Sequence, residues 1–333
     1  MLFNPKKKGP AIVIGDACVD DTLKLSEFTN VNETESKRRP VPIQAGGGTS
    51  ANTAVALAKL GVPTSFMGSL GCDYAGRFML RDLEAAGVST KNVIVDSQLN
   101  TVMVFAFIND QGERVLWGYP KEATSYSELA LDKVDLDDVR NARWLHSSGM
   151  NYLNSGSIRE SLPEIYRIAY EAGVETSFDL NTRVSDLSLL DPISVEAIRK
   201  TIPYVKYLTG SAKDEFVSFY PQDNWLDSLR HFADEDHKVI ARMGKEGFIV
   251  INNGEEKRCP SYDVEVKNTT GAGDCFSAAF IAATLEGKEI FEAAKYANAV
   301  SGYKISCGKQ TYDFDRETIE GFIKNTALRN TVE

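Results

Sequence analysis

The chain has 333 residues, 43% of them hydrophobic, and carries a formal net charge of −10. Nucleic-acid binding depends on clustered cations, so this charge disfavours nucleic acid, and we expect no nucleic-acid partner. No apolar run approaches the about 18 residues that cross a membrane. No signal peptide follows the lysines at positions 6–8, so we expect no membrane partner.

Cysteine and histidine usage predicts a reduced, cytoplasmic protein without a zinc site. The chain has five cysteines and three histidines, and no Cys-x-x-Cys pair. An odd number of scattered cysteines is unlike a disulfide framework, and their spacing is unlike that of zinc ligands.

Apolar runs alternate with segments of helical periodicity along most of the chain. The runs that predict buried strands are 11–14, 64–67, 144–147, 175–178, 204–208, 238–241 and 248–251. The segments that predict helices are 51–60, 75–86, 157–171, 194–201, 223–232, 274–285 and 290–304. The alternation predicts an α/β fold with a mostly parallel sheet and helices on both faces. Ligands then bind where the strands end.

Two regions do not follow this alternation. Residues 18–45 lack a helical pattern, and residues 101–119 alternate apolar and polar around a turn at 109–112, which predicts a hairpin. We expect one small sheet from these two insertions, about 18–45 and 100–120, on a single domain that spans 1–333. Long excursions from compact domains are often functional lids, although plain surface hairpins are an alternative.

A run of three glycines precedes the first predicted helix. Such bare backbone lets a small ligand approach its N–H groups. Thr49 or Ser50 is the expected helix cap, and Asn52 offers a donor and an acceptor that suit hydroxyl recognition. The segment lacks the spacing of Gly-x-Gly-x-x-Gly, and no P-loop motif occurs in the chain, so dinucleotide and P-loop sites are disfavoured.

The most informative stretch is 267–280, where Gly271 and Gly273 flank Ala272 just before a buried helix. The free N–H groups and the positive dipole end of such a helix favour an anion. A carboxylate beside that anion, Asp274, is explained if it removes a proton from a nucleophile that attacks a phosphoryl group. The alternative is a tight turn with a helix cap.

These two segments occur in the order typical of the ribokinase-like carbohydrate kinases, the PfkB family, which the chain resembles over nearly its whole length. The main signatures are 47–52 and 268–274, and weaker matches occur at 15–20, 68–76, 178–183 and 243–247. The resemblance implies a ribokinase-like three-layer fold with a mostly parallel central sheet, a small β-sheet lid, and a homodimer formed through that lid.

The resemblance also implies roles for individual residues. Asp274 would be the general base, and the backbone amides of Gly271, Ala272 and Gly273 would form the anion hole. The residues implied to bind the sugar are Asp20, Gly47, Gly48, Asn52 and Arg183, with Asp16 as a secondary candidate; for Arg183 a surface salt bridge is the alternative. ATP and Mg²⁺ are the implied cofactors, with Ser211, Gly244, Gly247, Thr270 and Asn298 on the nucleotide side.

The chain departs from the family pattern at two places. The segment that corresponds to Asn-x-x-Glu offers Ser211 and Asp214 as imperfect substitutes, so the metal ligands are not assigned. Asn268 stands where the family usually has an Asp that helps to hold potassium, and Lys309 lies near the potassium loop. An ammonium group could replace the ion, so we expect little potassium dependence.

The leading hypothesis is an ATP-dependent kinase that phosphorylates a primary hydroxyl of a sugar or sugar acid of the ribose, fructose or 2-keto-3-deoxygluconate type. The segment 179–183 favours the last two. One alternative is a nucleoside kinase of the same family, with a base against Phe105, Phe107, Trp117 or Tyr119. The other alternative is a sugar-sensing protein without turnover.

Overall fold

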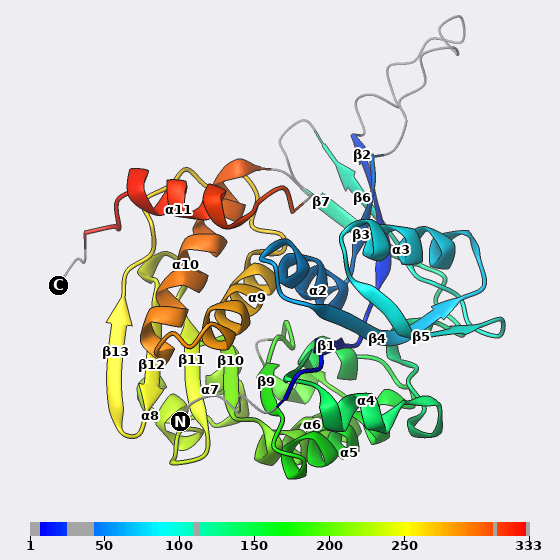
Figure 1. The fold of residues 1–333 in the computed structure, drawn as a ribbon, viewed down its shortest axis with the longest axis horizontal. Helices are drawn as coiled ribbons and strands as arrows, with labels where there is room; N and C mark the ends of the chain where they lie inside the picture. The colour runs from blue at the N-terminus through cyan, green and yellow to red at the C-terminus, as the bar shows by residue number, and fades with distance from the viewer. Residues whose placement is uncertain (1–6, 25–42, 110–113, 185, 309–311, 331–333) are drawn as a thin grey trace, which may run out of the picture.

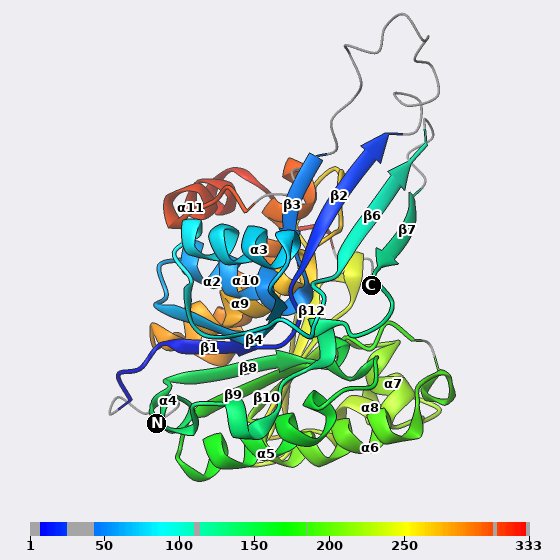
Figure 2. The ribbon, with the colours of Figure 1, turned by 90° about the vertical axis from the view of Figure 1, so that its right-hand side faces the viewer.

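The computed structural model describes residues 7–24, 43–109, 114–184, 186–308 and 312–330. Within them the chain forms a large and a small β-sheet, with helices on both faces of the large one (Figures 1 and 2). No helix in these ranges is long and apolar enough to cross a membrane.

The large sheet has nine strands in the order β13-β12-β11-β10-β9-β8-β1-β4-β5. The seven neighbouring strands β11, β10, β9, β8, β1, β4 and β5 pair in parallel. Strands β12 and β13 extend the sheet as an antiparallel edge. The mostly parallel sheet predicted from the sequence is therefore confirmed. Its strands are β1 (Ala11–Ile14), β4 (Thr64–Gly71), β5 (Ser89–Asp96), β8 (Trp144–Ser148), β9 (Glu175–Asp179), β10 (Tyr207–Ser211), β11 (Lys238–Arg242), β12 (Phe248–Asn252) and β13 (Glu255–Cys259).

The helices form two layers, which Figure 2 shows above and below the large sheet. The upper layer holds α2 (Thr49–Lys59), α3 (Tyr74–Ala85), α9 (Ala272–Leu285), α10 (Ile290–Cys307) and α11 (Arg316–Asn325). The lower layer holds α4 (Leu136–Asn141), α5 (Ile158–Glu171), α6 (Pro192–Thr201), α7 (Glu215–Phe219) and α8 (Trp225–His231).

Each helical layer packs on the sheet through its own apolar core. Successive side chains of β1 serve the two cores in turn, because a strand points alternate residues to opposite faces. Ala11 and Val13 join the core beneath α2 and α9, whereas Ile12 and Ile14 join the core beneath α5 and α6. The expected three-layer arrangement is confirmed.

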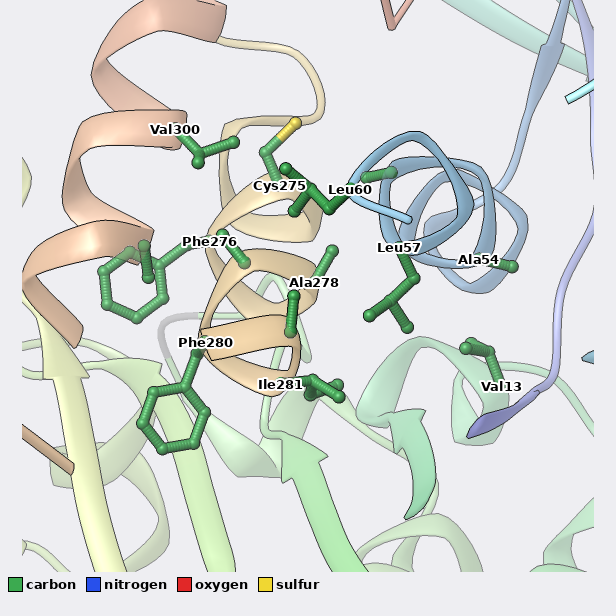
Figure 3. Packing of buried hydrophobic residues seen from close by; sticks show 14 of the residues in the cluster. Val13, Ala54, Leu57, Leu60, Cys275, Phe276, Ala278, Phe280, Ile281 and Val300 are labelled. Atoms are coloured by element: carbon green, nitrogen blue, oxygen red, sulfur yellow. The ribbon is translucent and has the colours of Figure 1, made fainter. Parts of the chain in front are cut away.

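Helix α9 is the central element of the upper core. Figure 3 shows Phe276, Ala278 and Phe280 of α9 among side chains of α2 and α10. All its residues from Asp274 to Thr284 are buried, and most of them are apolar, as is typical of a core helix. The loop that begins α9 is thereby held in a fixed position.

The small sheet projects from one end of the large sheet (Figure 2). Its strands, in the order β3-β2-β6-β7, are β3 (Ile43–Gly47), β2 (Cys18–Lys24), β6 (Met103–Ile108) and β7 (Arg114–Tyr119). The prediction that both insertions build one sheet is confirmed, while its role as a lid stays a prediction. Residues 25–42, and all but Asn109 of the predicted hairpin turn at 109–112, lie outside the described residues.

Candidate active site

The polar side chains predicted from the sequence converge where strands of the large sheet end. The first is Asp16, which follows β1 and is fully buried. Its carboxylate accepts the N–H groups of Thr49 at 2.7 Å and Ser50 at 2.9 Å, and the Ser50 hydroxyl at 2.7 Å. Asp16 therefore caps α2 across the fold and fixes the glycine run.

The helix cap predicted at Thr49 or Ser50 is wrong. The N-cap position is Gly48, and neither it nor its neighbours cap α2 through a side chain. Gly48 has φ 99°, and a Cβ atom there would lie 2.7 Å from the Asp16 carbonyl oxygen. Because β1 and α2 approach this closely, a carboxylate from the β1 loop reaches the helix amides in place of a local hydroxyl.

Asp20 of β2 lies directly against Gly47. A Cβ atom on Gly47 would be 2.5 Å from an Asp20 carboxylate oxygen, so glycine leaves that face of the carboxylate open. Burial raises the pKa of Asp20, and a contact from the Cys18 thiol at 3.5 Å partly opposes this. The structure thus brings together two of the residues predicted to bind the sugar.

Asn52 and Asp274 join the two glycine segments. The Asn52 Nδ2 group donates to Asp274 Oδ2 at 3.0 Å. Asp274 is only 6% exposed, and burial raises its pKa to about 7, although the Asn52 hydrogen bond acts in the opposite direction. A carboxylate with a pKa near neutral can hold and release a proton at physiological pH.

The turn before Asp274, which is the predicted anion site, requires glycine at Gly271. Gly271 has φ 75°, and a Cβ atom there would lie 2.5 Å from the Tyr312 hydroxyl, so only glycine fits. The N–H of Ala272 donates to the Thr269 carbonyl oxygen at 3.2 Å within the turn, and its place in the predicted anion hole stays a prediction. Gly271 and Gly273 keep that role as a proposal, since the first amides of a helix have no partner within it.

Arg242 is a functional candidate that the sequence analysis missed. It ends β11 and donates from both terminal nitrogens to Asp179 at 2.8 Å, as a bidentate pair. Its guanidinium carbon lies 3.7 Å from where a Cβ atom of Gly273 would be. The position directly after an apolar run could have marked Arg242 as a strand-end cation.

Glu215 is the second missed residue. Its carboxylate accepts the Ser211 N–H at 2.7 Å and lies 4.0 Å from Arg242. Burial and then the nearby charge of Asp179 raise the pKa of Glu215. Asp214, which the sequence suggested, instead bonds the Ser211 hydroxyl at the surface, at 2.6 Å. Shifting the expected motif by one residue would have found Glu215.

Arg183 lies on the acceptor side of the site and is exposed. Its charge favours the ionised form of both Asp20 and Asp274, partly offsetting the burial that raises the pKa of each. Asn181 and Arg183 have φ values of 22° and 54°, a strained backbone that often accompanies a binding role. Within the described residues Arg183 forms no ion pair, so the salt-bridge alternative gains no support.

A cavity of 380 Å³ lies beside the start of α9. It has an apolar wall that includes Tyr262, Val264, Val266 and Phe276. Four of the five residues predicted for the nucleotide line it, namely Ser211, Gly244, Gly247 and Asn298. Thr270 does not; its neighbour Thr269 does.

The carboxylates near the cavity fit a Mg²⁺ ion that arrives bound to a nucleotide, and not an ion held by the protein alone. No group of three or more His, Cys, Asp or Glu side chains able to hold a metal occurs in the described part of the chain. Mg²⁺ commonly keeps several waters and takes one or two carboxylates besides phosphate oxygens. Glu215 fits that requirement, because it lies near Asp179 and accepts a hydrogen bond from Ser211, which lines the cavity.

Comparison with known proteins gives one consistent result. The model of the pfkB family carbohydrate kinases matches residues 11–316. A 5-dehydro-2-deoxygluconokinase of Shouchella clausii is 28% identical over 91% of this chain and 92% of its own. An ATP-dependent ribose-1-phosphate kinase of Halopiger xanaduensis is 30% identical over 84% of this chain and 86% of its own.

Solved structures share the fold. The E. coli protein named "putative Ribokinase II", crystallised with ATP and Mg²⁺, superposes with a TM-score of 0.81 at 23% identity, covering 95% of this chain and 99% of that one. A fructokinase of Xylella fastidiosa with bound ATP gives a TM-score of 0.78 at 20% identity, covering 94% and 98%.

Proposed function

The chain belongs to the pfkB family of carbohydrate kinases, and we propose that it transfers a phosphoryl group from ATP to a primary hydroxyl of a sugar or sugar acid, with Asp274 as the general base. Kinase activity on a sugar-type acceptor, with ATP and Mg²⁺, comes with the family. The observation that carries the finer proposal is the hydrogen bond between Asn52 and Asp274, which joins the sugar-side glycine run to the predicted anion site.

On the acceptor side, Asp20, Gly47, Gly48 and Asn52 would bind the hydroxyl groups of the sugar. The reacting hydroxyl would donate its proton to Asp274 as its oxygen attacks the γ-phosphorus of ATP, and the bond from that phosphorus to the bridging oxygen would break to release ADP. The Asn52 amide, which donates to Asp274 Oδ2, holds the carboxylate in one orientation. A pKa of about 7 supports this role, since the group must be ionised to accept the proton.

On the phosphate side, the amides of Gly271 and Gly273 and the positive end of α9 would stabilise the charge of the transferred group. Arg242 supports the same role, because its guanidinium lies next to Gly273. Mg²⁺, when bound with ATP, neutralises phosphate charge, and Glu215 would hold it.

The acceptor is proposed to be an anionic sugar of the 2-keto-3-deoxygluconate type. Arg183 supports this, since it brings an exposed cation toward Asp20 and Asp274. The two relatives described above are named for a sugar acid and a sugar phosphate, which are both anionic. An anionic acceptor would add a further partner for this arginine, beside the carboxylates of Asp20 and Asp274.

The arrangement of the small sheet does not support the nucleoside alternative. Asp20 pairs with Val104, whereas Phe105 pairs with the next residue, Asp21. Neighbouring residues of a strand point to opposite faces, so the aromatic side chains lie on the face away from Asp20. The four aromatic residues that were candidates for stacking a base, all on that face, are Phe105, Phe107, Trp117 and Tyr119.

The same aromatic face supports the homodimer that the sequence predicts. Trp117 is 50% exposed, and its ring lies 5.7 Å from that of Phe105 and 5.8 Å from that of Tyr119. An exposed apolar strip on a small sheet is typical of an interface, and we propose that a second copy covers it. Trp117→Ser should shift the mass measured by light scattering from dimer to monomer, while Tyr170→Ser on α5 should not. A wild-type monomer would contradict the proposal.

The test of function is ATP consumption with a panel of sugar acids, sugar phosphates, neutral sugars and nucleosides. We expect turnover with an anionic sugar, and loss of preference for the anionic acceptor in Arg183→Ala. Sugar binding without ATP turnover for any acceptor would favour the sensing protein.

A further inference from the structure

The family model ends at residue 316, but the chain continues and returns to the cavity beside the start of α9. After α11, Leu328 forms an antiparallel bridge with Tyr262. The Asp263 N–H donates to the Ala327 carbonyl oxygen at 2.9 Å, and the Arg329 N–H donates to the Ser261 carbonyl oxygen at 2.8 Å. Residues 326–330, here called the C-terminal segment, are therefore paired with a wall of the cavity.

Arg329 itself lines the cavity and contacts three consecutive residues of that wall. Its Nε donates to the Tyr262 carbonyl oxygen at 3.4 Å, and Nη2 donates to the Val264 carbonyl oxygen at 3.4 Å. The Asp263 carboxylate lies 3.6 Å from Nε. The guanidinium of Arg329 thus connects the backbone of 262–264 to the C-terminal segment.

The wall needs such support, because residues 263–266 form no regular secondary structure. Backbone carbonyls outside helices and sheets must find hydrogen-bond partners elsewhere. A segment that lacks such partners must become ordered when a ligand binds, and this ordering lowers the affinity. Tyr262, Val264 and Val266 line the cavity from this segment. A planar guanidinium can bridge two carbonyls, whereas a lysine ammonium lacks that fork.

We propose that Arg329 is a positioning residue of the nucleotide site and that the C-terminal segment forms part of that site. Arg329 holds the wall formed by 262–266 in the shape that receives ATP. This inference rests on the proposed function, and it places ATP in the cavity because four of the five residues predicted for the nucleotide line it. The groups proposed for the chemistry, Asp274 and Arg242, lie on α9 and β11, so the inference concerns nucleotide affinity and not the transfer step.

The experiment compares full-length Arg329→Ala with the wild type in steady-state kinetics and in calorimetric binding of Mg²⁺-ATP without acceptor. We expect the KM and the Kd for ATP to rise about tenfold, with kcat and the acceptor KM within twofold. That split indicates lost nucleotide binding with the chemistry intact. Arg329→Lys should resemble Arg329→Ala, and Lys324→Ala, which removes a cation from the exposed end of α11, should resemble the wild type.

A second variant separates failure of this inference from failure of the proposed function. Val266 is 56% exposed and lines the cavity, so Val266→Arg should fill the cavity without disturbing the core. If Val266→Arg binds ATP normally, the cavity is not the nucleotide site and this inference falls, while the proposed function is judged by ATP turnover with the acceptor panel. If Val266→Arg loses ATP binding while Arg329→Ala keeps it, only the role of Arg329 is overturned. Should Arg329→Ala not fold, Arg329→Lys takes its place in the same comparison, and a wild-type Kd for ATP overturns the inference.

Discussion

Asn52 and Asp274 are 222 residues apart in the chain, and their side chains meet at 3.0 Å. Asn52 lies in the first turns of α2, and Asp274 lies in the first turn of α9, so the bond connects the starts of two packed helices. The packing of Leu57 against α9 keeps those helices in register (Figure 3). The amide of Asn52 stabilises the ionised form of Asp274, because it donates to the carboxylate.

Removing that donor should move the pH dependence of the enzyme. A hydrogen bond to the charged form of an acid lowers its pKa, so Asn52→Leu should raise the pKa of Asp274 above about 7. The base is active when ionised, and the acid limb of kcat/KM against pH should therefore shift upward. The variant should lose more activity at pH 6 than at pH 9. If the acid limb stays in place, the pKa of Asp274 does not set it. Asn92→Leu, which removes an amide away from the site, is the control and should leave the limb unchanged.

Arg242 is expected to affect both rate and stability. Arg242→Lys keeps the charge but loses the bidentate pair with Asp179. We expect kcat to fall about 10²-fold, because the loss of one donor to a developing negative charge has that effect. Arg242→Ala leaves Asp179 buried without its partner, which typically costs about 3–5 kcal/mol of unfolding free energy. Thermal melts and kinetics of both variants check this. If Arg242→Lys turns over normally, the guanidinium acts in the fold and not on the phosphoryl group.

Much of the fold could be predicted because its strands are apolar and its helices are periodic. The edge strand β13 was missed, since its residues are mostly charged and exposed. Pairing with β12, and not its own pattern, makes it a strand. Strand β10 begins at Tyr207 and not at 204, because residues 202–204 form a 3-10 turn.

The site was predicted mainly where glycine motifs, or segments that resemble the family pattern, mark it. Asp274 and Asn52 stood out beside glycines, but Arg242 and Glu215 lie among residues of ordinary composition. Their significance comes from the parallel sheet, which brings the ends of β9, β10 and β11 together. The capping of α2 by Asp16 is likewise a contact across the fold that no local pattern contains.

A buried lysine offers a reason why the activity is expected to depend little on potassium. Lys309 lies outside the described residues, but Lys304 at the end of α10 is 1% exposed, with its ammonium 4.4 Å from the centre of the Tyr312 ring. Its Cε lies 3.5 Å from where a Cβ atom of Gly271 would be, so a cation already stands behind the anion loop.

We therefore expect activity in potassium and in sodium, at equal ionic strength, to agree within about twofold. Activation by potassium of about tenfold, or about 1.4 kcal/mol, would contradict this. In Lys304→Ala, added ammonium or potassium should restore part of the lost activity, because the ion can enter the space. Lys295→Ala, on the same helix but half exposed, should show no such effect.

The sharpest expectation concerns the base itself. Asp274→Asn keeps the size of the side chain and leaves the Gly271 turn in place, but it removes the basicity, and loss of a general base costs about 10²- to 10⁴-fold in rate. The Kd for ATP should stay within a few-fold of wild type, or tighten slightly, because a negative charge beside the phosphates has gone. Single-turnover rates and calorimetry on the same preparation separate the two effects. An unfolded variant would make Asp274 a structural residue of α9, and normal turnover would mean that phosphoryl transfer takes place elsewhere.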